Sequence, residues 1–246
     1  MKNLYYVLHV KHGYDDRAES IIRQFNKLSL PIEWILEYDK EDITPHLLEF
    51  YKYRGTLSPA AISCSLKHIR ACEHIAQGDA GGGFVFEDDV VIDLDKFSEV
   101  SNIFLQEYQE KWPGCGYVSL GSGSALFVPW TKRKKEKWLY PAQHVRASDS
   151  YWINQETAVK MVEWIRLNGF DQPADHLIDQ ITGDLKIPIF WLAPTIADQG
   201  THTGLFASSI QQRGRGRLID QLGWRIKIFR RKFVYPLIGV DLRSND

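Results

Sequence analysis

The chain has 246 residues, of which 44% are hydrophobic and 25% charged, and its formal net charge is −1. This composition is typical of a globular domain with a sizeable core, and the balanced charge excludes a general preference for polyanions. No apolar run reaches the about 18 residues of a membrane span. The odd number of cysteines (Cys64, Cys72 and Cys115) and the short, aromatic first apolar run predict reduced thiols and a cytoplasmic protein without a signal peptide.

The first half of the chain alternates between predicted strands and helices. Apolar runs predict buried strands at Leu4–Val10 and Ile32–Leu36, with an amphipathic helix between them. Ser58 and Pro59 are typical of an N-cap and a first helical residue, and helical spacing of apolar residues continues to about residue 77. After a glycine-rich turn, Phe84–Phe86 is predicted to form the next strand.

The second half repeats this alternation. Strands are predicted at Gly116–Leu120, Tyr151–Ile153 and Ile187–Leu192, and an amphipathic helix at Glu156–Leu167. Strands that alternate with helices indicate an α/β fold with a largely parallel central sheet. In such sheets, ligands bind beyond the carboxyl ends of the strands.

Three consecutive acids, Glu87, Asp88 and Asp89, directly follow the Phe84–Phe86 strand. Because side chains alternate along a strand, we expect Glu87 and Asp89 on one side and Asp88 on the other. Carboxylate oxygens suit a hard divalent cation, and a bound diphosphate could supply further ligands. The alternative is a solvated acidic turn or the N-cap of a following element.

Two further pairs of residues are candidates for chemistry. His68 lies four residues after Cys64 and shares a helix face with it, but the sequence shows no further metal ligand beside them. A hydrogen-bonded structural histidine is the alternative. Asp175 and Asp179 are also four residues apart, and one of them could act as a general base. An N-cap and a surface acid are the alternative for this pair.

The segment 211–235 carries eight basic residues and one acid. Its apolar residues at 222, 226, 229 and 233 follow helical spacing, which predicts a basic amphipathic helix. Such a helix fits an anionic membrane surface, here the inner face of the cytoplasmic membrane; a helix packed on the domain is the alternative. No nucleic-acid-reading motif accompanies the charge, so no nucleic-acid partner is predicted. We therefore divide the chain into a domain at 1–210 and a C-terminal extension at 211–246.

Two motifs resemble glycosyltransferase family 25, which includes bacterial lipooligosaccharide galactosyltransferases and collagen galactosyltransferases. The run L-S-P-A-A-I-S-C-S-L-K-H at 57–68 is similar to the family's L-[ST]-P-G-E-I-G-C-x-x-S-H, and F-V-F-E-D-D-V at 84–90 is similar to its strand ending in E-D-D-V. Weaker similarities stand in the family's order over about residues 4–210: Asp16-Arg17, Ser150–Ile153, Pro173-Ala174-Asp175, Asp198-Gln199 and Ser208-Ser209-Ile210.

This resemblance implies a GT-A-like nucleotide-binding fold with a central, mostly parallel sheet. It implies inverting transfer of a hexose, galactose or a related sugar, from a UDP-sugar to a glycan or lipid-linked glycan such as lipopolysaccharide or lipooligosaccharide, with Mn²⁺ or Mg²⁺. Asp89 and Glu87 would hold the metal, and Asp175, with Asp179 second, is the predicted general base. The residues expected to contact the donor are Arg17, His68, Glu87 and Asp88.

The chain departs from the family pattern at several positions of the helix motif. Ala60 and Ala61 stand where the family has Gly-Glu, Ser63 replaces its second glycine, and Lys67 replaces its serine. A catalytically impaired homologue that binds nucleotide sugar or glycan without transfer is therefore the alternative. A magnesium-dependent phosphoryl-transfer enzyme is less consistent with the sequence, because Gly81–Gly83 precedes a strand rather than a helix.

Overall fold

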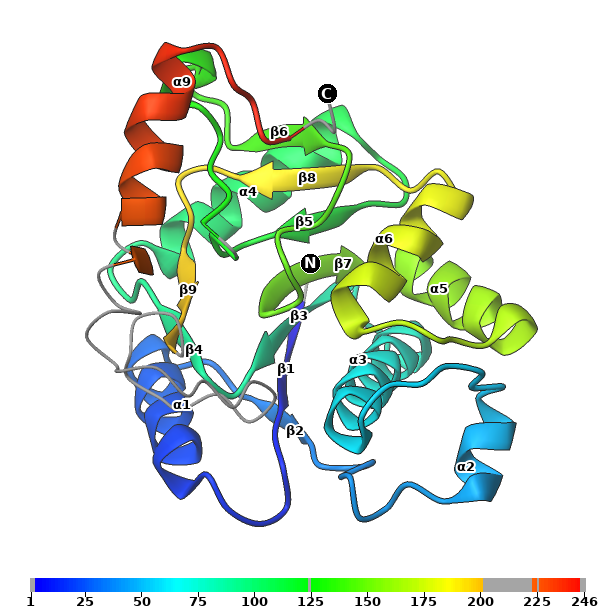
Figure 1. The fold of residues 1–246 in the computed structure, drawn as a ribbon. Helices are drawn as coiled ribbons and strands as arrows, with labels where there is room; N and C mark the ends of the chain where they lie inside the picture. Colours follow the sequence, from blue (N-terminus) through cyan, green and yellow to red (C-terminus); the bar gives the residue numbers. More distant parts are fainter. Residues whose placement is uncertain (1–2, 124, 201–222, 225, 244–246) are drawn as a thin grey trace.

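The computed structural model describes residues 3–123, 125–200, 223–224 and 226–243. They form a mixed α/β fold around a seven-stranded sheet with the order β2-β1-β3-β7-β5-β8-β6 (Figure 1). The expected α/β architecture with a mostly parallel central sheet is confirmed, and the GT-A-like fold stays a prediction.

The strands of the main sheet run in one direction except for β7 and β6. Strand β1 pairs in parallel with β2 and β3, and β5 pairs in parallel with β8. Strand β7 is antiparallel to both β3 and β5, so it joins the two parallel halves, and β6 is antiparallel to β8. The strands are β1 Asn3–Leu8, β2 Glu33–Ile35, β3 Gly82–Glu87, β5 Tyr117–Ser119, β6 Leu139–Ala142, β7 Ser150–Asn154 and β8 Ile189–Leu192, with β4 Val90–Ile92 and β9 Ala197–Gln199 in a separate two-stranded sheet.

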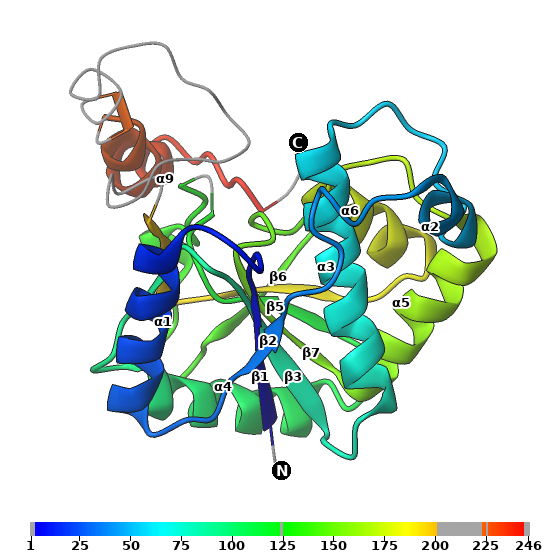
Figure 2. The same cartoon turned by 90° about the horizontal axis from the view of Figure 1, so that it is seen from below.

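Helices cover both faces of the main sheet, as Figure 2 shows. Alternate residues of β1 explain this: Tyr6 and Leu8 pack toward α3, α5 and α6, whereas Val7 packs toward α1 and α4. The helices are α1 Asp15–Leu28, α2 Pro45–Phe50, α3 Pro59–Gln77, α4 Phe97–Lys111, α5 Gln155–Asn168 and α6 Ala174–Asp184, with a short 3-10 turn η1 Trp130–Lys132. No helix in the described part of the chain is long and apolar enough to cross a membrane.

Helix α3 begins as the sequence predicts and carries part of the candidate site. The Ser58 hydroxyl accepts a hydrogen bond from the backbone N–H of Ala61 at 3.3 Å, and Pro59 is the first helical residue. Although α3 lies on the sheet, several of its buried residues are polar, including Lys67, His68 and Glu73. Burying such groups is unfavourable unless they have partners, so they indicate a specific polar environment under the helix.

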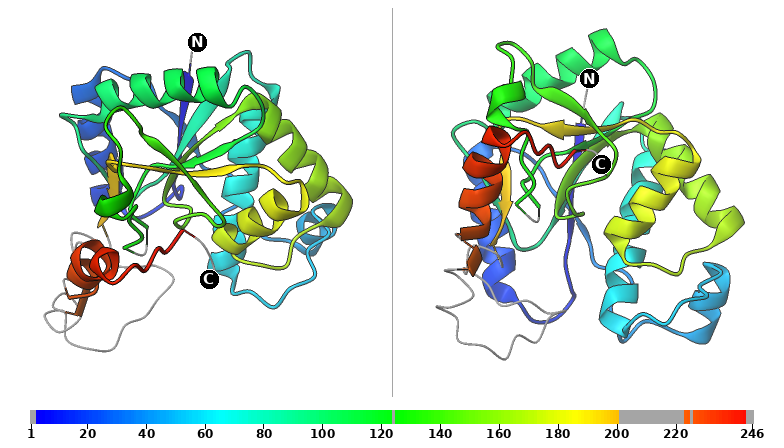
Figure 3. Two further views of the ribbon diagram at one scale, coloured as in Figure 1. Left: turned by 90° about the horizontal axis from the view of Figure 1, so that it is seen from above. Right: turned by 45° about the horizontal axis from the view of Figure 1, so that its top comes forward.

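The described end of the chain is helical and lies at the side of the domain opposite α3 and α5 (Figure 1 and Figure 3). It includes a π-helical turn, η2 Arg230–Val234, which continues into α9 Tyr235–Leu237. Lys132 of η1 contacts Asp241 at 3.1 Å and joins this end to the domain. The similarity at 208–210, the domain boundary at 210/211 and the basic segment 211–222 lie outside the described residues, so the division into two parts stays a prediction.

Candidate functional site

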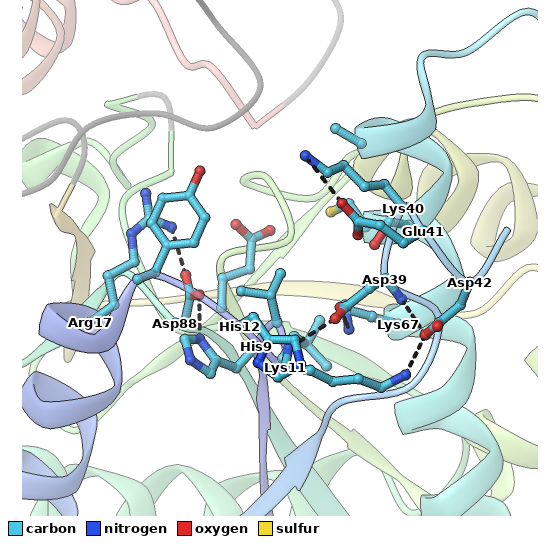
Figure 4. A pocket seen from close by; sticks show the side chains of 17 residues that line it. His9, Lys11, His12, Arg17, Asp39, Lys40, Glu41, Asp42, Lys67 and Asp88 are labelled. Atoms are coloured by element: carbon cyan, nitrogen blue, oxygen red, sulfur yellow. Dashed lines mark hydrogen bonds and ion pairs between the residues drawn. The ribbon is translucent and has the colours of Figure 1, made fainter.

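A cavity of about 550 Å³ lies at the carboxyl ends of β1 and β3, beside the first half of α3 (Figure 4). This is the edge of the sheet at which α/β folds bind ligands, and the volume is in the range of small-molecule sites. Positive and negative side chains share its wall. The lining includes Leu8–His12, Tyr14, Arg17, Asp39–Asp42, Ala60, Ser63, Cys64, Lys67, Glu87 and Asp88.

Asp88 is held by two basic side chains in one wall of this cavity. Its carboxylate accepts a hydrogen bond from Nη1 of Arg17 at 2.7 Å and lies 2.7 Å from Nδ1 of His9. Because an ionised carboxylate only accepts, Nδ1 of His9 carries the proton in this contact. All three side chains are buried, so this is a desolvated ion pair rather than a surface one. Arg17 and Asp88 therefore reach the cavity together.

Glu87 points to the α3 side of the same strand end. Its Oε1 accepts from the hydroxyl of Ser148 at 3.1 Å and lies 3.4 Å from Nε2 of His68. The other ring nitrogen of His68 lies 3.1 Å from the Tyr151 hydroxyl. Glu87 and Cys64 line the cavity, whereas His68 is buried behind them and does not line it.

Asp89 is buried near a fourth acid, Asp149, which no sequence motif marked. Asp149 precedes β7, and its backbone carbonyl accepts from the N–H of Glu87 at 2.9 Å. Burial, together with the negative charges of Glu87, Asp89 and Asp198, raises the pKa of Asp149 to about 8. Strand β3 ends at Glu87, and Asp88 and Asp89 form the turn that follows, so the strand alternation expected for the three acids does not extend to them. Glu87 and Asp88 line the cavity, and Asp89 does not.

The carboxyl group of Asp149 is fixed by its surroundings. The hydroxyl of Ser150 donates to its Oδ2 at 2.9 Å. A Cβ atom on Gly121 would lie 2.6 Å from the same oxygen, so any larger residue there would displace the carboxyl. Asp149 is thus a preorganised oxygen donor within a negatively charged neighbourhood.

Between about pH 4 and 8, we expect the free energy of unfolding of Asp149→Asn to fall less steeply with rising pH than that of the wild type. The folded carboxyl keeps its proton up to a pKa of about 8, whereas an unperturbed aspartate has a pKa of 3.8. In this window the folded state binds more protons than the unfolded state, so the free energy of unfolding of the wild type falls as pH rises, by up to about 1.4 kcal/mol per pH unit. Urea unfolding at stepped pH, with chelator present, measures both slopes. Identical slopes for wild type and variant would contradict the assignment.

Asp175 and Asp179 occupy the first turns of α6 but have different surroundings. Oδ1 of Asp179 accepts from the backbone N–H of Val145 at 2.7 Å, and burial raises its pKa to about 6, with a further contribution from Asp175. Asp179 therefore anchors the loop that leads to Asp149. Asp175 is half-buried, and its charge acts on Cys64, which places it on the α3 side of the site. Neither aspartate lines the cavity itself.

Arg146 is a second residue that the sequence did not mark. Its guanidinium is buried, donates from Nη1 to the carbonyls of Gly121 and Leu192 at 2.9 Å each, and stacks 4.7 Å over the Trp191 ring. Burial lowers its pKa to about 9. Arg146 thereby ties the loop before β7 to the ends of β5 and β8.

The donors in this region fall into two chemical sets. Glu87, Asp89 and Asp149 supply carboxylate oxygens, which suit Mg²⁺ or Mn²⁺; burial is the main cause of the raised pKa of Asp149, and the charges of Glu87 and Asp89 add to it. A different set converges most closely among the described residues: donor atoms of Cys64, His68 and Glu87 all lie within 4.8 Å of one another. Glu87 belongs to both sets.

The chain is similar to solved structures, one of which is a glycosyltransferase. Neither the family models nor the curated proteins match this chain. A solved structure described as "a glycosyltransferase involved in the glycosylation of the major capsid of PBCV-1" is similar at 11% sequence identity with a TM-score of 0.42. The match covers 91% of this chain and 99% of that chain. Similarity at this level assigns no residue roles, and membership of glycosyltransferase family 25 stays a prediction.

Proposed function

We propose that this protein is a glycosyltransferase that moves a hexose, galactose or a related sugar, from a UDP-sugar to a glycan acceptor such as lipopolysaccharide or lipooligosaccharide. The cavity at the carboxyl ends of β1 and β3 is the observation that carries this proposal. It combines basic side chains, which a diphosphate needs, with an acidic strand end, which a divalent ion needs. The motif resemblance at 57–68 and 84–90 points to the same chemistry.

Basic groups on opposite walls would bind the donor diphosphate. Arg17 is oriented on one wall by Asp88, and Lys67 on the other by Asp39 and the Glu37 carbonyl, each at 2.8 Å. Figure 4 shows these groups facing a common space. Because both side chains are already fixed by hydrogen bonds, they would lose little conformational entropy when a diphosphate binds.

Asp89 and Glu87 would hold Mn²⁺ or Mg²⁺, with Asp149 beside them. When bound, such an ion stabilises the negative charge that develops on the leaving diphosphate. The protein's own residues position the reactants: Arg17 and Lys67 orient the diphosphate, and His68 orients Glu87. Asp175 takes the proton from the acceptor hydroxyl, on the face of the sugar opposite the diphosphate, which gives inversion. Asp179, which bonds the Val145 amide, is the second candidate base.

The deciding experiment measures UDP release from a panel of UDP-hexoses, with Mn²⁺ and lipooligosaccharide fragments as acceptors. We expect transfer by the wild type, and Asp175→Asn should lower kcat about 10²-fold with little change in donor KM, because general-base catalysis contributes at this scale. Asp184→Asn, an exposed acid on the same helix, is the matched control. If no UDP-sugar binds or turns over, the proposed function is wrong.

A catalytically impaired homologue remains the second candidate function, and one position in the cavity favours it. Ala60 lines the wall at the place where the family resemblance has glycine, beside the position of its glutamate. A chain that binds a UDP-sugar in calorimetry but neither hydrolyses nor transfers it would have this second function.

We also propose that the C-terminal extension binds an anionic membrane surface, at the inner face of the cytoplasmic membrane. Within its described part, large apolar side chains are exposed next to basic ones such as Arg230 and Lys232. This combination is typical of helices that lie in a membrane interface. The exposed apolar residues are Ile226, Phe229, Phe233, Val234, Leu237, Ile238 and Val240.

The double substitution Phe229→Ser/Phe233→Ser is expected to weaken binding to phosphatidylglycerol vesicles by at least about tenfold, because each ring loses its apolar transfer energy. Leu167→Ser is the matched control, since Leu167 is 75% exposed on α5, away from the extension. Vesicle co-sedimentation measures both. Equal binding of the double variant and the wild type would show that these rings do not enter the bilayer.

A further inference from the structure

Cys64, His68 and Glu87 form a compact group of potential metal ligands at the inner wall of the cavity. Cys64 and His68 are one helical turn apart on α3, and Glu87 is the last residue of β3. Their sulfur, ring nitrogen and carboxylate oxygen all lie within 4.8 Å of one another. The sequence alone supplies the first two residues, and the packing of α3 on β3 adds the third.

The spacing of these donors fits a tetrahedral ion. In a tetrahedral zinc site with ordinary bond lengths, neighbouring ligand atoms are about 3.3–3.6 Å apart. Nε2 of His68 and Oε1 of Glu87 are already 3.4 Å apart. A small movement of the Cys64 sulfur is enough to complete a three-ligand set.

The groups around the ligands also suit a metal centre. Nδ1 of His68 contacts the Tyr151 hydroxyl, so Nε2 is the nitrogen directed at Glu87, and Ser148 fixes the carboxylate. Such outer contacts orient ligands in known metal sites. Burial raises the pKa of the Cys64 thiol well above its usual range, and the negative charges of Glu87, Asp175 and Asp88, opposed by Lys67, add to this rise. The same negative charges favour a cation beside the sulfur.

We propose that Cys64, His68 and Glu87 bind a borderline transition-metal ion such as Zn²⁺, with the fourth coordination position open to the cavity. Cys64 and Glu87 both line the cavity, so a water or ligand atom can reach that position. On binding, the S–H bond of Cys64 is replaced by a sulfur–metal bond and the proton leaves to solvent.

The sulfur and nitrogen donors set the metal preference. Thiolate and imidazole select Zn²⁺ or Co²⁺ over Mn²⁺ and Mg²⁺, which prefer oxygen. The site is therefore distinct from the carboxylate set at Asp89 and Asp149, although both use Glu87. Zn²⁺ and a Mn²⁺-bound donor would therefore compete for the Glu87 carboxylate. The proposed zinc site does not require that the protein transfers a sugar.

The test is a Co²⁺ titration of the full-length, metal-free protein without any nucleotide sugar, followed by displacement with Zn²⁺. We expect a thiolate-to-cobalt charge-transfer absorption that Zn²⁺ abolishes. Cys64→Ser should remove this absorption and weaken Co²⁺ binding by about 10²-fold or more, and Tyr151→Phe should weaken it by about tenfold. Cys115→Ser is the matched control for a cysteine outside the site, with circular dichroism to confirm folding.

Asp89→Asn separates this site from the carboxylate set. If the inference holds, Asp89→Asn keeps the charge-transfer absorption and Cys64→Ser loses it. Cobalt binding without a thiolate signal, or equal Co²⁺ affinity in wild type and Cys64→Ser, overturns the proposal. Because the titration contains no UDP-sugar, either result is independent of whether the enzyme transfers a sugar.

Discussion

Asp89→Asn is expected to lower kcat for transfer from a UDP-hexose by about 10²–10³-fold while the protein stays folded, the scale at which single electrostatic groups act in transition states. The substitution keeps the size of a side chain that is only 3% exposed, but removes its charge. Under the proposed function, the leaving diphosphate would then lack the cation that Asp89 is proposed to hold. Steady-state kinetics with Mn²⁺ measures the effect, and urea unfolding confirms the fold.

Asp93→Asn provides the matched control for Asp89. Asp93 lies just after β4 and pairs with Lys96 at 2.6 Å, away from the cavity lining. It should leave kcat unchanged. A folded Asp89→Asn variant with wild-type turnover would show that Asp89 holds no catalytic ion.

Asp88→Ala is expected to lower the free energy of unfolding by about 3–5 kcal/mol, as for other broken buried ion pairs. Arg17 and His9 both contact this carboxylate at 2.7 Å in a desolvated wall. Their side chains are 6% and 9% exposed, so water replaces the lost partner poorly. Chemical denaturation of wild type and variant at neutral pH measures the loss.

A double-mutant cycle identifies the source of this energy. Combining Asp88→Ala with Arg17→Met should recover part of the loss, because no charge then remains from the pair. Asp42→Ala is the control: its ion pair with Lys11 is more exposed, at 36% and 43%, and should contribute less than about 1 kcal/mol. A loss below about 1 kcal/mol for Asp88→Ala would mean that the wall does not depend on this pair.

The architecture followed from local signals in the sequence. Alternating apolar runs and the Ser58-Pro59 start located β1, β3 and α3, because strand periodicity and helix capping depend on neighbouring residues. The sequence also predicted that Glu87, Asp88 and Asp89 lie at the end of a strand. Strands β4, β6 and β9 were not predicted: β6 contains Pro141 and β9 is largely polar, so neither has the apolar run that marked β2, β5 and β8, and β4 directly follows the acidic turn.

The partners of the acids could not be predicted in the same way. Asp88 meets Arg17 from 71 positions earlier in the chain, and Glu87 meets Ser148 from 61 positions later. Asp149 has no motif of its own, and it reaches the site only because β7 pairs antiparallel with β3. A sequence pattern records neighbours along the chain, whereas these contacts depend on how the strands are ordered in the sheet.

The reversed direction of β7 has a consequence for how related proteins can diverge. At the ligand-binding edge of the sheet, β1 and β3 end, and the residues that follow them lie near the cavity. Strand β7 is antiparallel and begins at this edge, so Asp149 is the residue that precedes it. The segment before Asp149 is held by Asp179 at Val145 and by the two backbone contacts of Arg146, so its length and the register of β7 are fixed together. An insertion there would displace Ser148 and Asp149 from Glu87, so we expect related proteins to differ in the loops that follow β1 and β2, which line the cavity, rather than in this segment.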